Sequence, residues 1–241
     1  MNIPATADSP SRLYFLDWLR ILALMVLIFY HVGMYYVRWD FHVKSPFAGP
    51  GLEPWMMLSG PWRMDLLFMV SGAATALMLK AGATGELMRT RSKFLLLPLL
   101  CGIVFIVPPQ SYLEVVQKFS YSGDYWSFLK LYFGHSQDFC HNGHCLILPT
   151  WNHLWFLPYL WLYTMVLWLL MRALPLALNT GAQFAERCLA GARLAVVPIA
   201  VILVVRITLF ARYPATYAVW GDWFNHAMYF GMFVTGAVFA A

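Results

Sequence analysis

Charged residues are scarce in this sequence. They make up 11% of its 241 residues, whereas soluble proteins average about 25%. Hydrophobic residues account for 61%, against about 45–50% in an average protein. Because a soluble domain of this length needs far more charge on its surface, the composition excludes the soluble classes and predicts an integral membrane protein.

Acidic residues are the rarer of the two charge types, since 11 Asp and Glu stand against 16 Lys and Arg, for a net charge of +5. In a membrane chain this excess is typical of loop cations near the lipid surface. We therefore expect the lipid bilayer, and no nucleic acid, as a partner. The chain has only four cysteines: Cys101 falls in a predicted span, Cys188 in a short connection, and Cys140 and Cys145 in one loop. This pattern excludes a disulfide framework.

The run from Cys140 to Cys145 reads CHNGHC and leaves three interpretations open. Thiolates and imidazoles are the usual zinc ligands, but this spacing is not a standard one. In an oxidising exterior a local disulfide is favoured. The third interpretation is a loop without a further role. We predict no metal site.

Long apolar runs predict an all-α, polytopic transmembrane helix bundle. We expect about six spans, at 13–37, 60–80, 94–112, 151–171, 194–210 and from 223 onward. We expect Pro108-Pro109 to stop or bend the third span. Residues 1–241 are expected to form one domain, in which 113–150 is an extracytoplasmic segment with a helix around 127–133. Because the last span would end at Ala241 without a polar cap, we expect a fragment of a roughly ten-span protein.

Loop cations set the expected orientation. The connection from Lys80 to Lys93 is rich in basic residues, and the 172–193 connection and Arg12 agree with it. We expect a cytoplasmic N-terminus and a position in the inner (plasma) membrane. A cleavable signal peptide is not expected, because the first apolar run is too long and no small-residue cleavage site follows it.

The first span carries three ionisable residues, Asp17, Arg20 and His31. Each costs roughly 2.5 kcal/mol or more inside a membrane, so such groups tend to face protein or water at a working site. Their helical spacing puts them on one face, with Arg20 and His31 about 16 Å apart along the axis. The alternatives are a buried histidine bonded to a backbone carbonyl, and an Asp17–Arg20 ion pair at the interface.

Five motifs occur in order: LDWLRILALMVLIFYH, LLFMVSG, RTRSKFLLLPLL, PPQSYLE and HLWFLPYLWLY. Together they resemble acyltransferase family 3, the multi-span membrane acyltransferases. The resemblance extends from about Arg12 to the end. It is closest to the branch that contains glucan-biosynthesis protein C, the proposed succinyltransferase of periplasmic glucans.

The resemblance implies transfer of an acyl group from cytoplasmic acyl-CoA to a hydroxyl of an exported glycan or glycolipid. Acetyl-CoA or succinyl-CoA would be a co-substrate, and no bound cofactor is implied. The family's arginine–histidine pattern falls on Arg20 and His31, and its small-residue motif on Ser71 and Gly72. Its basic motif falls on three residues that would bind acyl-CoA: Arg89, Arg91 and Lys93.

Elementary chemistry is compatible with these roles. O-acylation needs a base for the hydroxyl proton, and histidine suits that task. His31 could be that base or could carry the acyl group transiently. Arg20 could hold a CoA phosphate or the developing oxyanion, and Asp17 could orient Arg20.

Further residues are candidates for substrate binding. Arg63 and Asp65 either pair with each other or reach the acceptor sugar. Four more lie at the outer rim, where polar and aromatic groups could bind a sugar: Gln110, Tyr112, Glu114 and His153. The alternatives involve no substrate. Arg89, Arg91 and Lys93 would then be cytoplasmic cations that only set the membrane orientation, and Ser71-Gly72 would serve helix packing.

The rival from another class is a transporter or flippase subunit that uses Asp17, Arg20 and His31 as a proton relay or substrate gate. Transport predicts substrate movement without acyl-CoA, whereas the enzyme predicts CoA release that depends on an acceptor. A purely structural subunit leaves the charged stripe unexplained.

Overall fold

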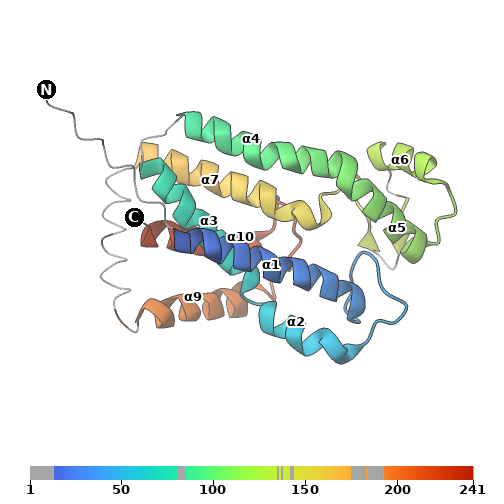
Figure 1. Ribbon diagram of the computed structural model, residues 1–241, viewed down its shortest axis with the longest axis horizontal. Helices are drawn as coiled ribbons and strands as arrows, with labels where there is room; N and C mark the ends of the chain where they lie inside the picture. The colour runs from blue at the N-terminus through green and yellow to red at the C-terminus, as the bar shows by residue number, and fades with distance from the viewer. Residues whose placement is uncertain are drawn as a thin grey trace, which may run out of the picture.

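The protein is a bundle of long helices that run side by side (Figure 1). The computed structural model describes residues 14–80, 85–134, 136, 138–141, 144–174, 183, 191 and 193–240. The long helices are α1 (Tyr14–Tyr36), α3 (Arg63–Lys80), α4 (Gly85–Cys101), α5 (Val107–Phe119), α7 (Phe156–Ala173), α9 (Arg193–Leu209) and α10 (Trp223–Phe239). The short elements are η1 (Pro50–Leu52), α2 (Glu53–Ser59), η2 (Gly102–Ile106), α6 (Tyr125–Phe133), β1 (Cys140–His141), β2 (His144–Cys145) and η3 (Asn152–Trp155).

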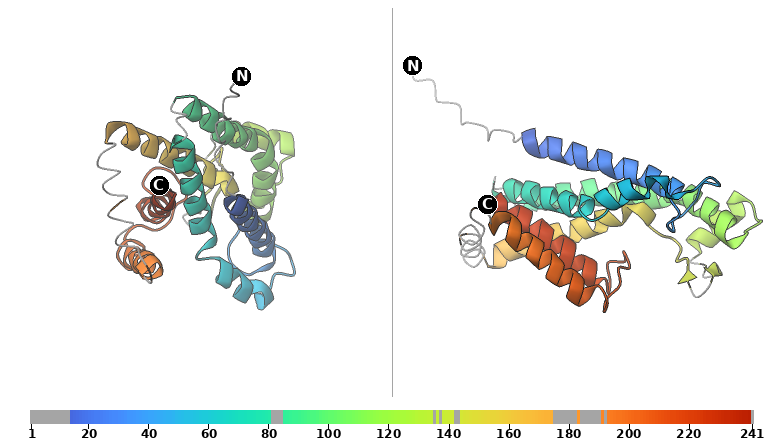
Figure 2. Two further views of the ribbon diagram at one scale, coloured as in Figure 1. Left: turned by 60° about the vertical axis from the view of Figure 1, so that its left-hand side comes forward. Right: turned by 90° about the horizontal axis from the view of Figure 1, so that it is seen from below.

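When α4 and α5 are counted as one continuous stretch, successive long helices alternate in direction, so the bundle has two distinct ends (Figures 1 and 2). We call the end at which α1 and α4 begin the basic end, because it carries Arg20, Arg89, Arg91 and Lys93. We call the opposite end, formed by the 37–49 loop, α5, α6 and the small hairpin, the loop end.

The described residues contain four stretches long and apolar enough to cross a membrane: Tyr14–Tyr36, Pro50–Lys80, Gly85–Phe119 and Asn152–Ala173. The all-helical membrane bundle is therefore confirmed. Helices α9 and α10 have 17 residues each and fall just below that length, so the expected count of six spans is not confirmed. The predictions that involve Arg12, Arg187 and Cys188 concern residues outside the described ranges.

The third span does not stop at Pro108-Pro109, so the expected stop was wrong, whereas Figure 1 shows the alternative, a bend, between α4 and α5. Helix α4 passes into the π-helix η2, which continues into α5 as far as Phe119. The prolines fall in the first turn of α5, where a missing N–H is best tolerated. The wide turn of the π-helix thus lets a helical stretch accommodate two consecutive prolines.

Helices α3 and α10 cross with their backbones in contact. A Cβ atom at Gly72 would collide with the carbonyl oxygen of Phe233, and one at Gly236 with that of Met69. This confirms the close-packing interpretation of the Ser71-Gly72 motif, which small residues favour in membranes. Around the crossing lies the main core, in which Phe68 stacks on Tyr229 with ring centroids 4.7 Å apart.

A second core lies at the loop end. It joins α5, α6 and the chain around the hairpin, and its buried members are Val107, Val115, Phe128, Tyr132, Phe139 and Leu148. Asp124 caps α6 by accepting the Ser127 N–H at 2.9 Å, as expected for a helix in this region. Cys140 and Cys145 form a disulfide, so the local-disulfide interpretation holds and their sulfurs are not zinc ligands. Residues 113–150 therefore form a folded cap.

Candidate functional site

A cavity of about 840 Å³ lies at the loop end of the bundle. Its walls come from α1, the 37–49 loop, the start of α3, α5, η3, α9 and α10. Three histidines line it, namely His31, His42 and His153. This volume is in the range of small-molecule sites, about 300–1,000 Å³.

His31 projects from α1 into this cavity. Its Nδ1 lies 2.8 Å from the carbonyl oxygen of Leu27. A carbonyl only accepts hydrogen bonds, so Nδ1 carries the proton and Nε2 keeps its lone pair. The backbone-bonded interpretation of His31 thus holds, and the bond to Leu27 fixes a ring that lines the cavity.

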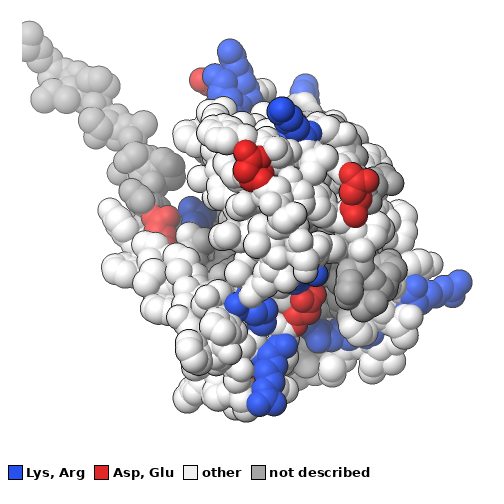
Figure 3. Space-filling view, turned by 90° about the vertical axis from the view of Figure 1, so that its right-hand side faces the viewer, with Lys and Arg blue, Asp and Glu red and all other residues white. Residues whose placement is uncertain are grey.

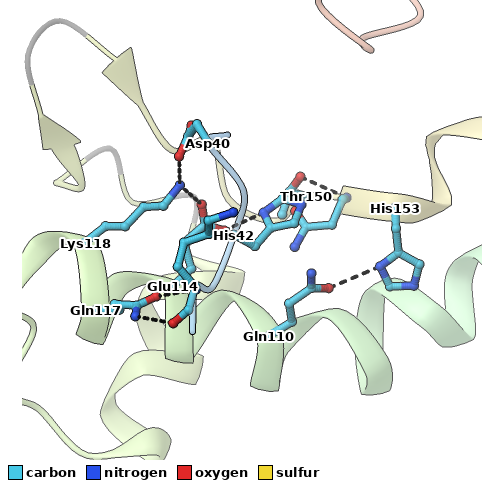
Figure 4. Close-up of polar contacts among 10 residues, drawn as sticks. Asp40, His42, Gln110, Glu114, Gln117, Lys118, Thr150 and His153 are labelled. Carbon is cyan, nitrogen blue, oxygen red and sulfur yellow. Dashed lines mark hydrogen bonds and ion pairs between the residues drawn. The ribbon is translucent and has the colours of Figure 1, made fainter. Parts of the chain in front are cut away.

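His153 is held in the same manner from η3. Its Nδ1 lies 3.1 Å from Oε1 of Gln110, which extends from α5 (Figure 4). The Gln110 oxygen also only accepts, so Nε2 of His153 is unprotonated. The His31 and His153 ring centroids are 6.2 Å apart. The structure therefore brings together three of the expected site residues.

His42 forms a different kind of contact. Its Nδ1 lies 2.7 Å from Oε2 of the buried Glu114, whose Oε1 is 3.3 Å from Lys118 Nζ. Lys118 also contacts Asp40 at 2.9 Å (Figure 4). The Lys118 ammonium lowers the pKa of Asp40 by donating a hydrogen bond to its carboxylate. One cation thus joins two carboxylates from different segments.

The 37–49 loop is fastened to α5 at alternate residues, because Asp40, His42 and Lys44 each contact one face of that helix. The backbone N–H of Lys44 donates to Gln117 Oε1 at 2.8 Å, and Gln117 Nε2 donates to the Lys44 carbonyl at 2.9 Å. Figure 3 shows the resulting mixture of acidic and basic side chains at this end of the molecule. The loop is therefore a fixed wall of the cavity.

Arg63 and Asp65 both line the cavity but are not paired with each other in the part of the chain that the structure describes. The Arg63 guanidinium lies over the Tyr30 ring at 3.2 Å and donates to the Gly60 carbonyl at 3.0 Å. Among the described residues, three buried atoms here have no hydrogen-bond partner: Arg63 Nε, Asp65 Oδ1 and Asn152 Nδ2. The residues that line the cavity thus include three unsatisfied polar groups.

Asp222 holds the opposite wall. It is fully buried and accepts hydrogen bonds from the backbone N–H groups of Thr216 (3.2 Å) and Tyr217 (3.0 Å), from Asn225 Nδ2 (2.8 Å) and from the Tyr159 hydroxyl. These bonds satisfy its charge and fix the segment that presents Tyr217 to the cavity.

Tyr112, also expected at the site, does not line the cavity. Its hydroxyl donates to the Gly123 carbonyl at 3.2 Å, and its ring packs against Tyr125 and Phe128. Its position in the structure is that of a packing residue of the second core.

The remaining expected residues lie at the basic end, away from the cavity lining. Arg20 and Asp17 are 4.0 Å apart on α1. Arg91 Nη2 donates to Thr75 Oγ1 at 2.5 Å, and Arg20 is near enough to repel it electrostatically. Arg89 and Lys93 are exposed. The predicted residues thus form two groups, one at each end.

Sequence reasoning missed His42, Asp40, Lys118 and Asn152. His42 and Glu114 are 72 positions apart, so no local pattern connects them. The available signal was a histidine just after a span that already contained an intramembrane histidine, in the run WDFHVK.

The sequence profile of the acyltransferase 3 family, described as an acyltransferase domain, matches residues 13–241. No curated protein and no solved structure matches the chain. The branch around glucan-biosynthesis protein C is accordingly not confirmed. Because the profile covers nearly the whole chain, and the chain has apolar helices long enough to cross a membrane, this protein belongs to acyltransferase family 3 and is a membrane acyltransferase.

Proposed function

We propose that the protein transfers an acyl group, acetyl or succinyl, from cytoplasmic acyl-CoA to a hydroxyl of an extracytoplasmic glycan or glycolipid. The loop end would face the exterior and the basic end the cytoplasm of a cell whose inner membrane holds the protein. The observation that carries this proposal is His31, a histidine of the first span that lines a cavity of about 840 Å³ and whose Nε2 has no hydrogen-bond partner among the described residues.

His31 is the group that receives the hydroxyl proton. As the acceptor oxygen bonds to the thioester carbon, its proton passes to Nε2 and the carbon–sulfur bond breaks. The imidazolium then returns the proton to the departing thiolate, so no proton is gained or lost overall. The Leu27 carbonyl, 2.8 Å from Nδ1, orients the ring throughout.

Arg63 and Asn152 are suited to the negative charge that develops on the thioester oxygen. Their Nε and Nδ2 atoms are buried donors without partners. Donors fixed in advance at such a point are a large source of rate enhancement. Asp65 Oδ1, an unpartnered acceptor, suits a second hydroxyl of the sugar.

The lining of the cavity favours a glycan as the acceptor. Indole rings of Trp39, Trp151 and Trp155 stand beside the polar groups. Apolar faces with a few directed hydrogen-bonding groups are the usual composition of a small-molecule site, and a sugar ring presents the complementary surfaces.

The basic end suits the phosphates of CoA. Helix α4 supplies Arg89, Arg91 and Lys93, and α1 supplies Arg20. One guanidinium group can donate to two phosphate oxygens at once. Asp17, 4.0 Å from Arg20, orients that side chain.

The test is mass spectrometry of glycans from cells that carry wild-type protein, His31→Ala or His31→Gln. We expect both variants to lose the acyl mass increment, and that increment in the wild type identifies acetyl or succinyl. His31→Gln keeps a donor for the Leu27 carbonyl, so its folding and expression should match wild type. Retained acylation in a normally expressed variant would remove the proposed base.

A further inference from the structure

Two histidines of the cavity are nearly equivalent in their chemical state. His31 and His153 have ring centroids 6.2 Å apart and both line the cavity. Each Nδ1 is bonded to an uncharged oxygen, of Leu27 or of Gln110. Neither ring contacts a carboxylate in the described part of the chain, whereas His42 does. Two unprotonated Nε2 atoms therefore share one small space, although a single-step transfer needs only one.

We propose that these two histidines divide the reaction: His31 carries the acyl group and His153 is the base for the acceptor. The proposal rests on the proposed function and replaces its single step with two. It also assigns Gln110 as the residue that positions His153.

In the first step, Nε2 of His31 attacks the thioester carbon and the carbon–sulfur bond breaks. The electron pair leaves with the thiolate, which takes a proton from water. The acyl group is then on Nε2, and Nδ1 keeps its proton and its bond to the Leu27 carbonyl. The acyl-imidazolium is reactive toward oxygen nucleophiles.

In the second step, the acceptor hydroxyl gives its proton to Nε2 of His153. Its oxygen bonds to the acyl carbon, the carbon–Nε2 bond breaks, and the electron pair returns to His31. His153 then releases its proton to water, which balances the proton taken up by the thiolate.

The separation of the two ends favours two steps over one. Residues of the basic end do not appear in the cavity lining, which includes His31, Asp65, Glu114 and His153. Donor and acceptor are thus expected to approach from opposite ends. A covalent carrier on α1 lets each substrate react without the other being present.

The spacing of the rings fits the second step. A hydroxyl oxygen lies about 2.8 Å from a nitrogen to which it donates. Ring centroids 6.2 Å apart place the two imidazoles close enough for one substrate hydroxyl to reach both. His153 would therefore accept the proton of the oxygen that attacks the acyl carbon.

The residue before His153 has a left-handed backbone conformation. Asn152 has a φ of 40°, in a region that asparagine adopts more readily than most non-glycine residues. Thr150 Oγ1 accepts its backbone N–H at 3.3 Å. This turn leads directly into η3, the element that carries His153.

The experiment separates the two steps. Purified wild-type protein, His153→Gln and His31→Gln are mixed with acetyl-CoA or succinyl-CoA without acceptor. Released thiol and the mass of the His31 peptide are then measured. Glycan acylation is measured in cells that carry the same variants. We expect His153→Gln to release about one CoA per protein and to accumulate acyl-His31, while glycan acylation falls about 100-fold or more.

A second variant keeps the histidine. Gln110→Leu should slow glycan acylation and leave the CoA burst unchanged, whereas Leu113→Ala, at an exposed position of the same helix outside the cavity lining, should leave both unchanged. Normal glycan acylation in His153→Gln, or loss of its CoA burst, would overturn the proposal. Failure of the wild type to use acyl-CoA at all would instead overturn the proposed function, so the two failures are distinct.

Discussion

The two ends of the bundle hold their charged side chains in different ways. At the loop end, Lys118 contacts both Asp40 and Glu114, and Glu114 contacts His42. At the basic end, no ion pair in the described residues joins Arg89, Arg91 or Lys93 to a carboxylate. Paired charges hold neighbouring segments together, whereas cations without a carboxylate partner attract a ligand of opposite charge.

This difference fits the proposed two-sided transfer. Under that proposal the acceptor side needs a cavity of fixed shape in which a proton can be moved, and the loop end would supply it. The donor side would need only to hold phosphates while the acyl group is released, for which the cations of the basic end would be sufficient. The following predictions test the contrast, from the largest expected effect to the smallest.

Gly72→Leu should disrupt the structure at both ends of the bundle. Helix α3 connects them, with Arg63 and Asp65 at one end and Lys80 at the other. A side chain at Gly72 meets the backbone of α10, which cannot give way. We expect a loss of about 3 kcal/mol or more of unfolding free energy. The measurement is the yield of monodisperse protein in detergent and its melting temperature.

The matched control is Gly231→Ala on α10, where nothing lies within 4 Å of the new Cβ. We expect it to fold normally. A Gly72→Leu protein that melts like this control would show that the crossing does not support the bundle.

Glu114→Leu and Glu86→Leu make the same change on α5 and α4. Glu114 is buried between His42 and Lys118, whereas Glu86 is exposed. We expect the first to cost about 2 kcal/mol, because it removes the carboxylate that pairs with His42 and one of the two carboxylates that contact Lys118. We expect the second to stay within about 0.5 kcal/mol. Thermal unfolding measures both. Equal effects would contradict the view that the ion pairs of Glu114 stabilise the loop end.

Arg91→Lys keeps the positive charge but loses the planar guanidinium. We expect KM for acyl-CoA to rise about tenfold, that is about 1.4 kcal/mol, with little change in the KM for the acceptor. Arg212→Lys, an exposed cation between α9 and α10, is the control and should alter neither constant. An unchanged KM for acyl-CoA in Arg91→Lys would remove this arginine from the phosphate site.

Asp40→Asn should have the smallest effect, less than about 1 kcal/mol, because Asp40 is a largely exposed partner of Lys118. Lys118 lowers the pKa of Asp40 in the folded protein. The contribution is therefore complete above the unfolded value of about 3.9 and disappears as the pH falls below it. Unfolding measured from pH 6 to pH 3 should show wild type and variant converging at the acid end. A gap that stays constant across this range would contradict the ion pair.

Helix positions were largely predictable, because one apolar run corresponds to one helix. The expected spans at 60–80 and 151–171 became Arg63–Lys80 and Phe156–Ala173. The cavity residues His31 and His153 were predicted because histidine is costly in an apolar span and at its border. Family membership followed from motif order and is confirmed across residues 13–241.

Contacts between distant segments were not predictable. The His42–Glu114 pair depends on how the 37–49 loop folds back on α5, which no periodicity encodes. Tyr112 looked like a rim residue because phenols bind sugars, yet the neighbouring aromatic rings of α6 bury it in a core. The π-helix η2 likewise has no simple sequence signal, so the sequence could not decide whether the prolines stop the helix or bend it.

The π-helix η2 determines how the following helix, α5, is rotated about its own axis. Each residue of an α-helix turns the chain by about 100°, so the wide turn at Gly102–Ile106 decides which side of α5 meets the cavity. Gly102 also makes room there for Leu154, the residue after His153. Loss of a single residue from this turn would rotate Gln110 away from His153 and Glu114 away from His42, so both histidines would lose their hydrogen-bond partners on α5.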